Sequence, residues 1–249
     1  SYYPLITGLG SPFTEINSIK KFFFKFLISQ LYRVALKNSF KVILQNKDDM
    51  SLILKLKIIR QKKKLFVVNG SGVDLNSYPL SSLPSKPLFL MVSRLLIYKG
   101  VREYVKAAKI VRSRFPTVKF QLAGGLDENP SCINIHELQS WINQGDIEYL
   151  GEIKSVQSIL KSCKYYVLPS YYREGVPRST LEALSTGRPI ITTDLPGCRE
   201  TVIHQRNGLL IPAKDTLALA NAMIRLLEEK EEVIQNMAKE SFLIAKNKF

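Results

Sequence analysis

Short apolar runs alternate with segments of helical periodicity along residues 65–230, and this alternation restricts the possible folds more than any other feature of the chain. Leu88–Ser93 reads LFLMVS, and in the following Lys99–Arg114 the apolar residues recur at helical spacing. The same pattern predicts further strands at Leu65–Val68, Val118–Ala123, Ile147–Leu150, Tyr165–Pro169, Pro189–Thr193 and Gly208–Ile211. It predicts further helices at His136–Asn143, Val156–Cys163, Thr180–Thr186 and Asp215–Glu229, and a last helix that ends near Lys246.

The predicted strands are almost continuously apolar, which is typical of strands that are buried on both faces. Strands that alternate with helices in this way form parallel sheets with helices on both sides. The sequence therefore predicts an α/β fold, with a Rossmann-like doubly wound parallel sheet over about residues 84–230. Ligands of such folds bind at the carboxyl ends of the strands, so the residues that follow each strand are the candidates for function.

The first quarter of the chain differs from the rest in its charge. The chain has 36 Lys and Arg and 21 Asp and Glu, a net charge of +15, and residues 1–64 alone hold 13 of the cations and 3 of the acids. In this part Lys20–Leu36 is apolar with periodic cations, Lys41–Gln45 is a predicted strand and Asp49–Lys57 a predicted helix. With a Pro- and Ser-rich linker at Tyr78–Pro87, we expect a partial N-terminal domain over residues 1–83 and a second domain over residues 84–249.

Composition excludes several classes of protein. A hydrophobic share of 45% and a charged share of 23% are ordinary for a globular chain and exclude disordered and collagen-like classes. No apolar run reaches about 18 residues, so we expect no transmembrane helix. Cys132, Cys163 and Cys198 lie far apart without metal-ligand spacing, which favours reduced thiols in a cytoplasmic protein and no metal site.

Two cations follow the predicted strand Leu88–Ser93. Arg94 comes directly after it, and Lys99 lies with Gly100 at the start of the next predicted helix. Two cations beside a helix N-terminus can bind an anion, and both side chains suit a phosphate group. Taken alone, the same residues also fit a solvated loop with two surface cations.

Two glutamates follow the predicted strand Tyr165–Pro169. Glu174 precedes a helix in which Pro177 is expected at the first position, and Glu182 lies in the second turn of that helix. The helix N-terminus offers free N–H groups to a phosphate, Gly175 permits close approach of its backbone, and carboxylates accept hydrogen bonds from vicinal hydroxyls. The pattern indicates a sugar or ribose clamp beside a phosphate site, although each glutamate alone also fits a helix cap or an exposed residue.

These residues resemble a known family. The stretch REGVPRSTLEALSTGRPIITTDLPGCRE at residues 173–200 is similar to the donor-site signature of family 4 glycosyltransferases of the GT-B fold, in which two glutamates are also separated by seven residues. SRLLIYKG at residues 93–100 resembles the phosphate-binding loop of that family, and NGSGVDL at residues 69–75 resembles its interdomain turn. ETVIHQRNGLLIPAKD at residues 200–215 resembles the segment that closes its donor domain. The resemblance covers nearly all of residues 65–230 and implies a GT-B donor domain plus part of a GT-B N-terminal domain.

The resemblance implies a role for each matching position. Arg94 and Lys99 are expected to bind the nucleotide diphosphate, Glu174 the donor sugar and Glu182 the ribose. The backbone of Gly175, Val176, Pro177 and Arg178 is expected to hold a phosphate, and Gly151, Glu152 and Ile153 to border the base. The family retains anomeric configuration and generally needs no metal held by an Asp-x-Asp motif, and this chain contains no such motif.

Tyr171–Arg178 most resembles bacterial enzymes that build surface polysaccharides or lipid-linked oligosaccharides. These use a UDP-sugar, often an N-acetylhexosamine, and an undecaprenyl-diphosphate-linked acceptor. The family's N-terminal domain has roughly twice the 80 or so residues that precede the linker here, and its C-terminal crossover helix is missing after Phe249, so we expect a chain truncated at both ends. A nucleotide-sugar-binding fragment without catalysis therefore stays open. His136 and His204 are expected to be structural or surface residues.

The basic N-terminal quarter leaves two interpretations open. Residues 18–64 can lie on an anionic membrane, with Phe22, Phe23, Phe24, Phe26 and Leu27 against acyl chains, which would make the protein peripheral on the inner face of the cytoplasmic membrane. Alternatively, the segment is a helix packed in the N-terminal domain, with its cations in solvent. A basic membrane-associated protein without transferase activity is a third function to weigh. Nucleic acid is not an expected partner, because no recognition motif accompanies the charge.

Overall fold

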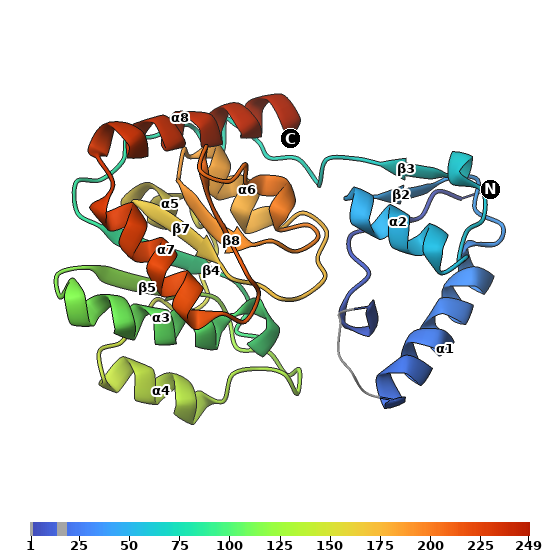
Figure 1. The fold of residues 1–249 in the computed structure, drawn as a ribbon, viewed down its shortest axis with the longest axis horizontal. Helices are drawn as coiled ribbons and strands as arrows, with labels where there is room; N and C mark the ends of the chain where they lie inside the picture. Colours follow the sequence, from blue (N-terminus) through green and yellow to red (C-terminus); the bar gives the residue numbers. More distant parts are fainter. Residues whose placement is uncertain (1, 14–18) are drawn as a thin grey trace.

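The computed structural model describes residues 2–13 and 19–249, so Ser18, the first residue of the segment expected at a membrane, lies outside the described residues. The described part contains two parallel sheets (Figure 1). The smaller sheet has the order β1-β2-β3 and belongs to what we call the N-terminal lobe, residues 2–13 and 19–68. The larger has the order β6-β5-β4-β7-β8-β9 and belongs to what we call the C-terminal lobe, residues 84–249.

The strands are short, and in the larger sheet β7 and β8 are buried at every residue. They comprise β1 (Leu5–Ile6), β2 (Val42–Leu44), β3 (Leu65–Val67), β4 (Leu88–Val92), β5 (Lys119–Ala123), β6 (Glu148–Tyr149), β7 (Tyr165–Leu168), β8 (Ile190–Thr193) and β9 (Gly208–Ile211). The helices comprise α1 (Ile19–Leu36), α2 (Lys47–Lys55), α3 (Val101–Arg114), α4 (Ile135–Asn143), α5 (Gln157–Ser162), α6 (Arg178–Ser185), α7 (Thr216–Glu228) and α8 (Glu231–Lys248). Each predicted strand and helix is present within a few residues of its expected bounds, and the α/β prediction is confirmed.

The order of the larger sheet defines where a ligand can bind. The chain builds β4, β5 and β6 outward in one direction and then returns to place β7, β8 and β9 on the other side of β4. This is the strand order of the doubly wound dinucleotide-binding fold, and its direction reverses between β4 and β7. The loops that leave these two neighbouring strands diverge to opposite faces of the sheet, so a crevice opens between them at their carboxyl ends.

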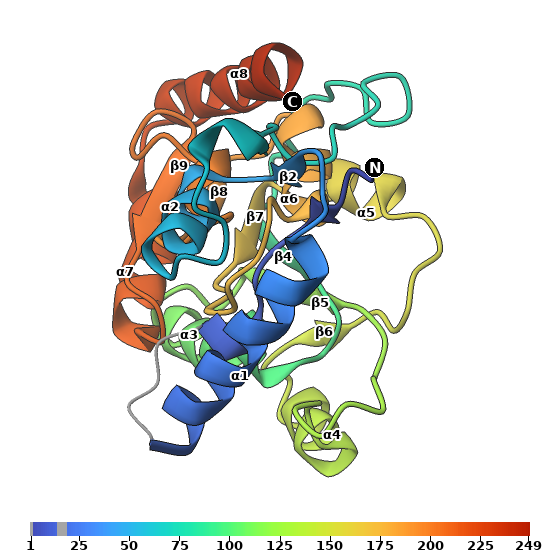
Figure 2. The ribbon, with the colours of Figure 1, turned by 90° about the vertical axis from the view of Figure 1, so that its right-hand side faces the viewer.

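The N-terminal lobe has its own small core. Val42, Leu44 and Ile53 are fully buried in it, and the side chain of Asn46 caps α2 by accepting a hydrogen bond from the backbone N–H of Asp49 at 2.7 Å. Figure 2 views this lobe from outside, with α1 in the foreground. None of the helices in the described ranges is both long and apolar enough to cross a membrane.

Arg188 fixes the linker to the C-terminal lobe although its side chain is fully buried. Its guanidinium donates to the carbonyl of Cys163 at 2.8 Å and to that of Thr186. On its other side it donates to the Ser82 carbonyl at 3.2 Å and to both the hydroxyl and the carbonyl of Ser81. Carbonyl oxygens thus surround the buried charge and hold the linker against the start of β8.

We predict that Arg188→Met lowers the free energy of unfolding by about 3 kcal/mol, because several buried carbonyls lose a charged donor. The measurement is urea unfolding followed by the fluorescence of Trp141, the one tryptophan of the chain. Arg206→Met is the matched control, since Arg206 is 58% exposed and forms a surface ion pair with Glu240, and its loss should stay below about 1 kcal/mol. Equal losses in the two variants would contradict the assigned role of Arg188.

Candidate functional site

An ion pair joins the loops that follow β4 and β7. Lys99 Nζ lies 2.6 Å from Glu174 Oε2, and the two side chains are only 16% and 11% exposed. The two loops approach closely because Gly100 has no side chain and a left-handed φ of 82°: a Cβ there would lie 2.2 Å from the carbonyl oxygen of Pro169. The backbone N–H of Tyr171 also donates to the Tyr98 carbonyl at 2.9 Å. Lys99 and Glu174, which the sequence predicts to bind different parts of one ligand, thus lie together at this crevice.

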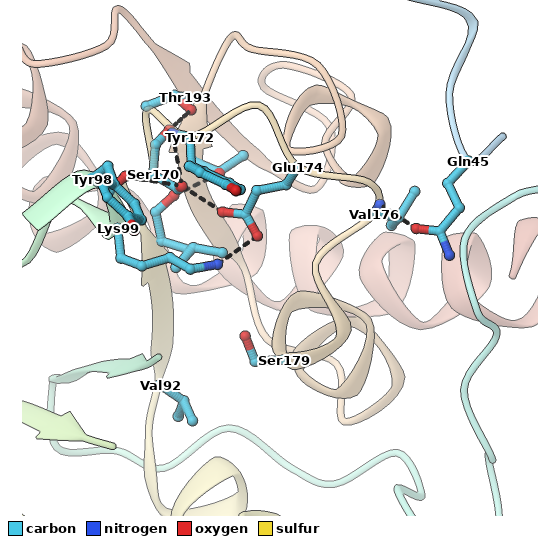
Figure 3. A network of polar contacts seen from close by, with 12 residues as sticks. Gln45, Val92, Tyr98, Lys99, Ser170, Tyr172, Glu174, Val176, Ser179 and Thr193 are labelled. Atoms are coloured by element: carbon cyan, nitrogen blue, oxygen red, sulfur yellow. Dashed lines mark hydrogen bonds and ion pairs between the residues drawn. The ribbon is translucent and has the colours of Figure 1, made fainter. Parts of the chain in front are cut away.

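The Glu174 carboxylate is oriented from a second side. Its Oε1 accepts a hydrogen bond from the Ser170 hydroxyl, and the Ser170 carbonyl in turn accepts one from the Thr193 hydroxyl at the end of β8 (Figure 3). The rings of Tyr98 and Tyr172 stack beside the ion pair with their centroids 4.9 Å apart. Residues from the ends of three neighbouring strands thus fix one carboxylate and one ammonium group at the carboxyl edge of the sheet.

The N-terminal lobe contacts the same loop. The Gln45 side chain accepts a hydrogen bond from the backbone N–H of Val176 at 3.1 Å, and Asn46 donates to the carbonyl of Glu174 at 3.3 Å. Arg173 Nε lies 2.6 Å from Oδ1 of the fully buried Asp49. Burial raises the pKa of Asp49, and the Arg173 guanidinium opposes that effect. The loop that carries Glu174 is therefore held by both lobes.

Helix α6 starts at the crevice, close to the ion pair. Pro177 is its N-cap residue and not its first helical residue as expected, because its ψ of 123° is extended, and it makes no side-chain cap hydrogen bond. The hydroxyl oxygens of Ser93, after β4, and of the fully buried Thr180, in the first turn of α6, have no hydrogen-bond partner among the described residues. Unpaired buried hydroxyls between a strand end and a helix start are suited to a polar ligand or an ordered water.

Glu182 lines a separate part of the crevice, a cleft of about 660 Å³ between α6 and the segment Ser71–Tyr78. Its Oε1 lies 3.1 Å from Arg178 Nε, and Tyr78 lines the same cleft beside its carboxylate. Burial raises the pKa of Tyr78, and the neighbouring Glu182 raises it further. Arg178 itself is 79% exposed, so it can turn toward a ligand in this cleft.

Arg94 does not contact the Lys99–Glu174 pair. It is 67% exposed and pairs with Asp127 in the loop after β5, at 2.8 Å. The expected base-bordering residues lie beside that same loop: Gly151 accepts a hydrogen bond from the N–H of Gly124 at 2.8 Å, and Glu152 lies against Gly125. Ile153 follows in the same half-exposed segment. The predicted site residues thus form three neighbouring groups: Lys99 with Glu174, Glu182 with Arg178, and Arg94 with the loops after β5 and β6.

Cys198 and the two histidines take no part in these groups as reactive side chains. Burial and the neighbouring Glu174 carboxylate raise the pKa of the Cys198 thiol to about 12, so it is uncharged at neutral pH and a poor nucleophile. His204 accepts a hydrogen bond from the N–H of Leu210 at 3.0 Å, and His136 is exposed at the start of α4.

Three site residues were not singled out in the sequence. Ser170 and Gln45 each lie at the end of a predicted strand or directly after it, so the rule that ligand-binding residues follow strands could have selected both. Tyr78 belongs to the expected linker, and nothing in its local sequence marks it as a neighbour of Glu182, which lies more than 100 residues later.

Solved structures share this fold over nearly the whole of the chain. Sucrose-phosphate synthase from Thermosynechococcus elongatus superposes with a TM-score of 0.80 at 22% identity, over 99% of this chain and 63% of the other. HepE of Anabaena in complex with UDP also superposes with a TM-score of 0.80, at 20% identity, over 99% of this chain and 68% of the other. The GT-B type of fold expected from the sequence is confirmed.

Curated relatives that are similar to the chain in sequence are named as sugar transferases. A Campylobacter jejuni N,N'-diacetylbacillosaminyl-diphospho-undecaprenol alpha-1,3-N-acetylgalactosaminyltransferase is 30% identical over 251 residues, which cover 95% of this chain and 64% of the relative. An Escherichia coli UDP-Gal:alpha-D-GlcNAc-diphosphoundecaprenol alpha-1,3-galactosyltransferase is 26% identical over 86% of this chain and 58% of the relative. A model of the family described as Glycosyl transferases group 1 matches residues 86–229, more than half of the sequence. The chain belongs to the group 1 glycosyltransferases.

Proposed function

We propose that this chain carries the donor site of a retaining glycosyltransferase, which transfers a sugar from a nucleotide diphosphate, with UDP the expected nucleotide, to a lipid-linked or polysaccharide acceptor in bacterial surface glycan synthesis. The observation that carries the proposal is the Lys99–Glu174 ion pair at the carboxyl ends of β4 and β7. It lies at the point where doubly wound folds bind nucleotides, within the segment that matches the family.

The leaving diphosphate needs positive charge at its position. The Lys99 ammonium is nearly excluded from solvent, and in such an environment its attraction for a phosphate is stronger than in water. Fixed donors of this kind stabilise the charge that develops as the glycosidic bond breaks, and the loss of one typically costs about 3 kcal/mol. A phosphate at Lys99 would also meet the backbone N–H groups at the start of α6.

Donor binding would free two carboxylates from their present partners, and each can then bind another part of the donor. If a phosphate takes the Lys99 ammonium, the Glu174 carboxylate becomes free to accept hydrogen bonds from hydroxyls of the transferred sugar. Glu182 would accept the ribose hydroxyls in place of Tyr78 and Arg178. Arg94 would turn from Asp127 to the diphosphate, and Gly151, Glu152 and Ile153 would border the base.

The phosphate site also depends on the N-terminal lobe. We assign the Val176 N–H to a phosphate, but in this structure it donates a hydrogen bond to the Gln45 side chain at 3.1 Å. Donor binding at this N–H therefore requires Gln45 to withdraw, which couples the donor to the contact between the lobes.

A nucleotide-sugar-binding chain without catalysis is the second candidate, because the chain spans 64% and 58% of the first two relatives. An assay of sugar transfer from UDP-sugars to a synthetic lipid-diphosphate-linked sugar separates the two functions. Transfer supports the enzyme, and donor binding without transfer supports the binding chain.

We predict that Glu182→Gln weakens UDP binding at least tenfold, because the ribose hydroxyls lose a charged acceptor worth about 1.5–3 kcal/mol. Isothermal titration calorimetry with UDP measures the change. Glu240→Gln, on the surface beside Arg206, is the control and should leave the affinity unchanged. Unchanged UDP affinity in folded Glu182→Gln would overturn the ribose assignment.

We predict that Arg94→Met weakens binding of UDP more than binding of uridine, because the guanidinium meets only the diphosphate. Because Arg94 is 67% exposed, its replacement should leave the fold intact. Calorimetric titration with both ligands gives the two ratios. A loss of the same size for UDP and for uridine would remove Arg94 from the phosphate site.

We propose further that α1 lies on an anionic membrane surface. Its outward face is apolar, with Phe22 and Phe23 each more than 70% exposed, followed along the helix by Phe26, Leu27, Leu31 and Val34. The excess of ten cations in residues 1–64 complements anionic lipid headgroups.

We predict that the chain sediments with vesicles that contain phosphatidylglycerol and not with vesicles of phosphatidylcholine alone. The double variant Phe22→Ser, Phe23→Ser should reduce the bound fraction severalfold, because these rings would enter the acyl region. Leu217→Ser on α7, a side chain with 66% exposure in the other lobe, is the control. Binding that is independent of lipid charge, or unaffected by the double variant, would contradict a membrane-facing α1.

A further inference from the structure

A second pocket, of about 350 Å³, lies beside the loop that carries Glu174. Arg173, Arg199 and Lys214 supply its charged groups, and Phe13 of the N-terminal lobe and Tyr171 supply aromatic walls. Apolar residues of the loops after β8 and β9 complete it, and no carboxylate is among its described lining residues. The pocket is therefore suited to an anionic group attached to an apolar or ring-shaped one.

The three cations differ in how far other groups engage them. Lys214 has no carboxylate partner among the described residues, and its ammonium lies 4.9 Å from the centroid of the Tyr171 ring. Arg173 is engaged through Nε by Asp49, which lies behind it and is fully buried. Arg199 is held by Asp194 at 3.0 Å and, across the lobes, by Asp48 at 3.7 Å. Lys214 is thus the most available charge, and the two arginines are fixed in position around it.

The pocket is separate from the donor crevice but close to it. Arg173 directly precedes Glu174, and Pro196, another lining residue, directly precedes Gly197. A Cβ on Gly197 would lie 1.6 Å from the carbonyl oxygen of Gly175, so the backbone of this segment touches the loop beside Glu174. A ligand in the pocket would therefore lie beside the loop that carries Glu174, close to the donor crevice.

We propose that this pocket binds the diphosphate of a lipid-linked saccharide acceptor, an inference that rests on the proposed transferase function. The names of the two curated relatives describe acceptors with one sugar on a diphospho-undecaprenol. In such an acceptor the diphosphate is attached to the same sugar ring that carries the receiving hydroxyl. An anion site must therefore lie about the width of one sugar ring from the point of transfer. Tyr171 and Arg173 of the loop that carries Glu174 line the pocket, which agrees with that requirement, and its aromatic walls suit the ring or the first isoprene unit.

The backbone of Lys214 supports an assigned role for its side chain. Lys214 has a left-handed φ of 61°, a region that glycine or asparagine occupies more readily. A lysine is nevertheless present here, and its ammonium group lies over an aromatic wall of the pocket.

Farnesyl diphosphate is the probe, titrated calorimetrically into the chain in the presence of saturating UDP so that the donor crevice is occupied. We expect Lys214→Met to weaken farnesyl diphosphate about tenfold, as for loss of one charge-assisted contact, with unchanged affinity for UDP. Lys106→Met, which removes an exposed cation from α3, is the matched control and should change neither affinity. Farnesol should bind far more weakly than farnesyl diphosphate, and inorganic diphosphate should respond to Lys214→Met as farnesyl diphosphate does.

Three results would overturn the proposal: no effect of Lys214→Met on farnesyl diphosphate, equal weakening of UDP, or equal binding of farnesol. The failures of the two proposals can be told apart. If UDP binds and farnesyl diphosphate does not, the acceptor pocket alone is wrong, whereas failure of the unaltered chain to bind UDP refutes the donor site on which it rests.

Discussion

The ion pair between Lys99 and Glu174 is the interaction on which the rest of the site depends. It joins the two halves of the sheet where their direction reverses, and its side chains are 16% and 11% exposed. A pair removed from water in this way gains little net stability, because desolvation offsets most of the attraction, yet either charge left alone would be strongly unfavourable. Such a pair is therefore well suited to exchange partners: a diphosphate can replace Glu174 at Lys99, and sugar hydroxyls can then satisfy Glu174.

The surrounding structure keeps this pair in place from both lobes. Ser170 and the end of β8 orient Glu174 from the C-terminal lobe, while Gln45 and Asn46 hold its backbone and that of Val176 from the N-terminal lobe. Gly197 permits the closest approach, since any side chain there would overlap the Gly175 carbonyl. Donor binding, contact between the lobes and the proposed acceptor pocket thus share one loop, which gives a physical basis for coupling between the two substrates.

Much of the fold could be predicted from the sequence because its signals are local. LFLMVS and GLLI are apolar runs bounded by polar or turn residues, and Asp215 caps α7 as its position indicates. Glu174 and Glu182 could be selected because their spacing matches a family signature. The partners of these residues could not: Tyr78 reaches Glu182, and Gln45 reaches Val176, only through contacts between segments more than 100 residues apart. For Arg94 the sequence was misleading. Its position in the loop after β4 suggests that it lies beside Lys99, whereas its side chain pairs with Asp127.

The structure of the chain with UDP bound tests the account most directly. It should place the β-phosphate within hydrogen-bonding distance of Lys99 Nζ and the Val176 N–H, with Gln45 displaced and the ribose hydroxyls on Glu182. UDP bound elsewhere, with the Lys99–Glu174 pair and the Gln45 contact undisturbed, would contradict it.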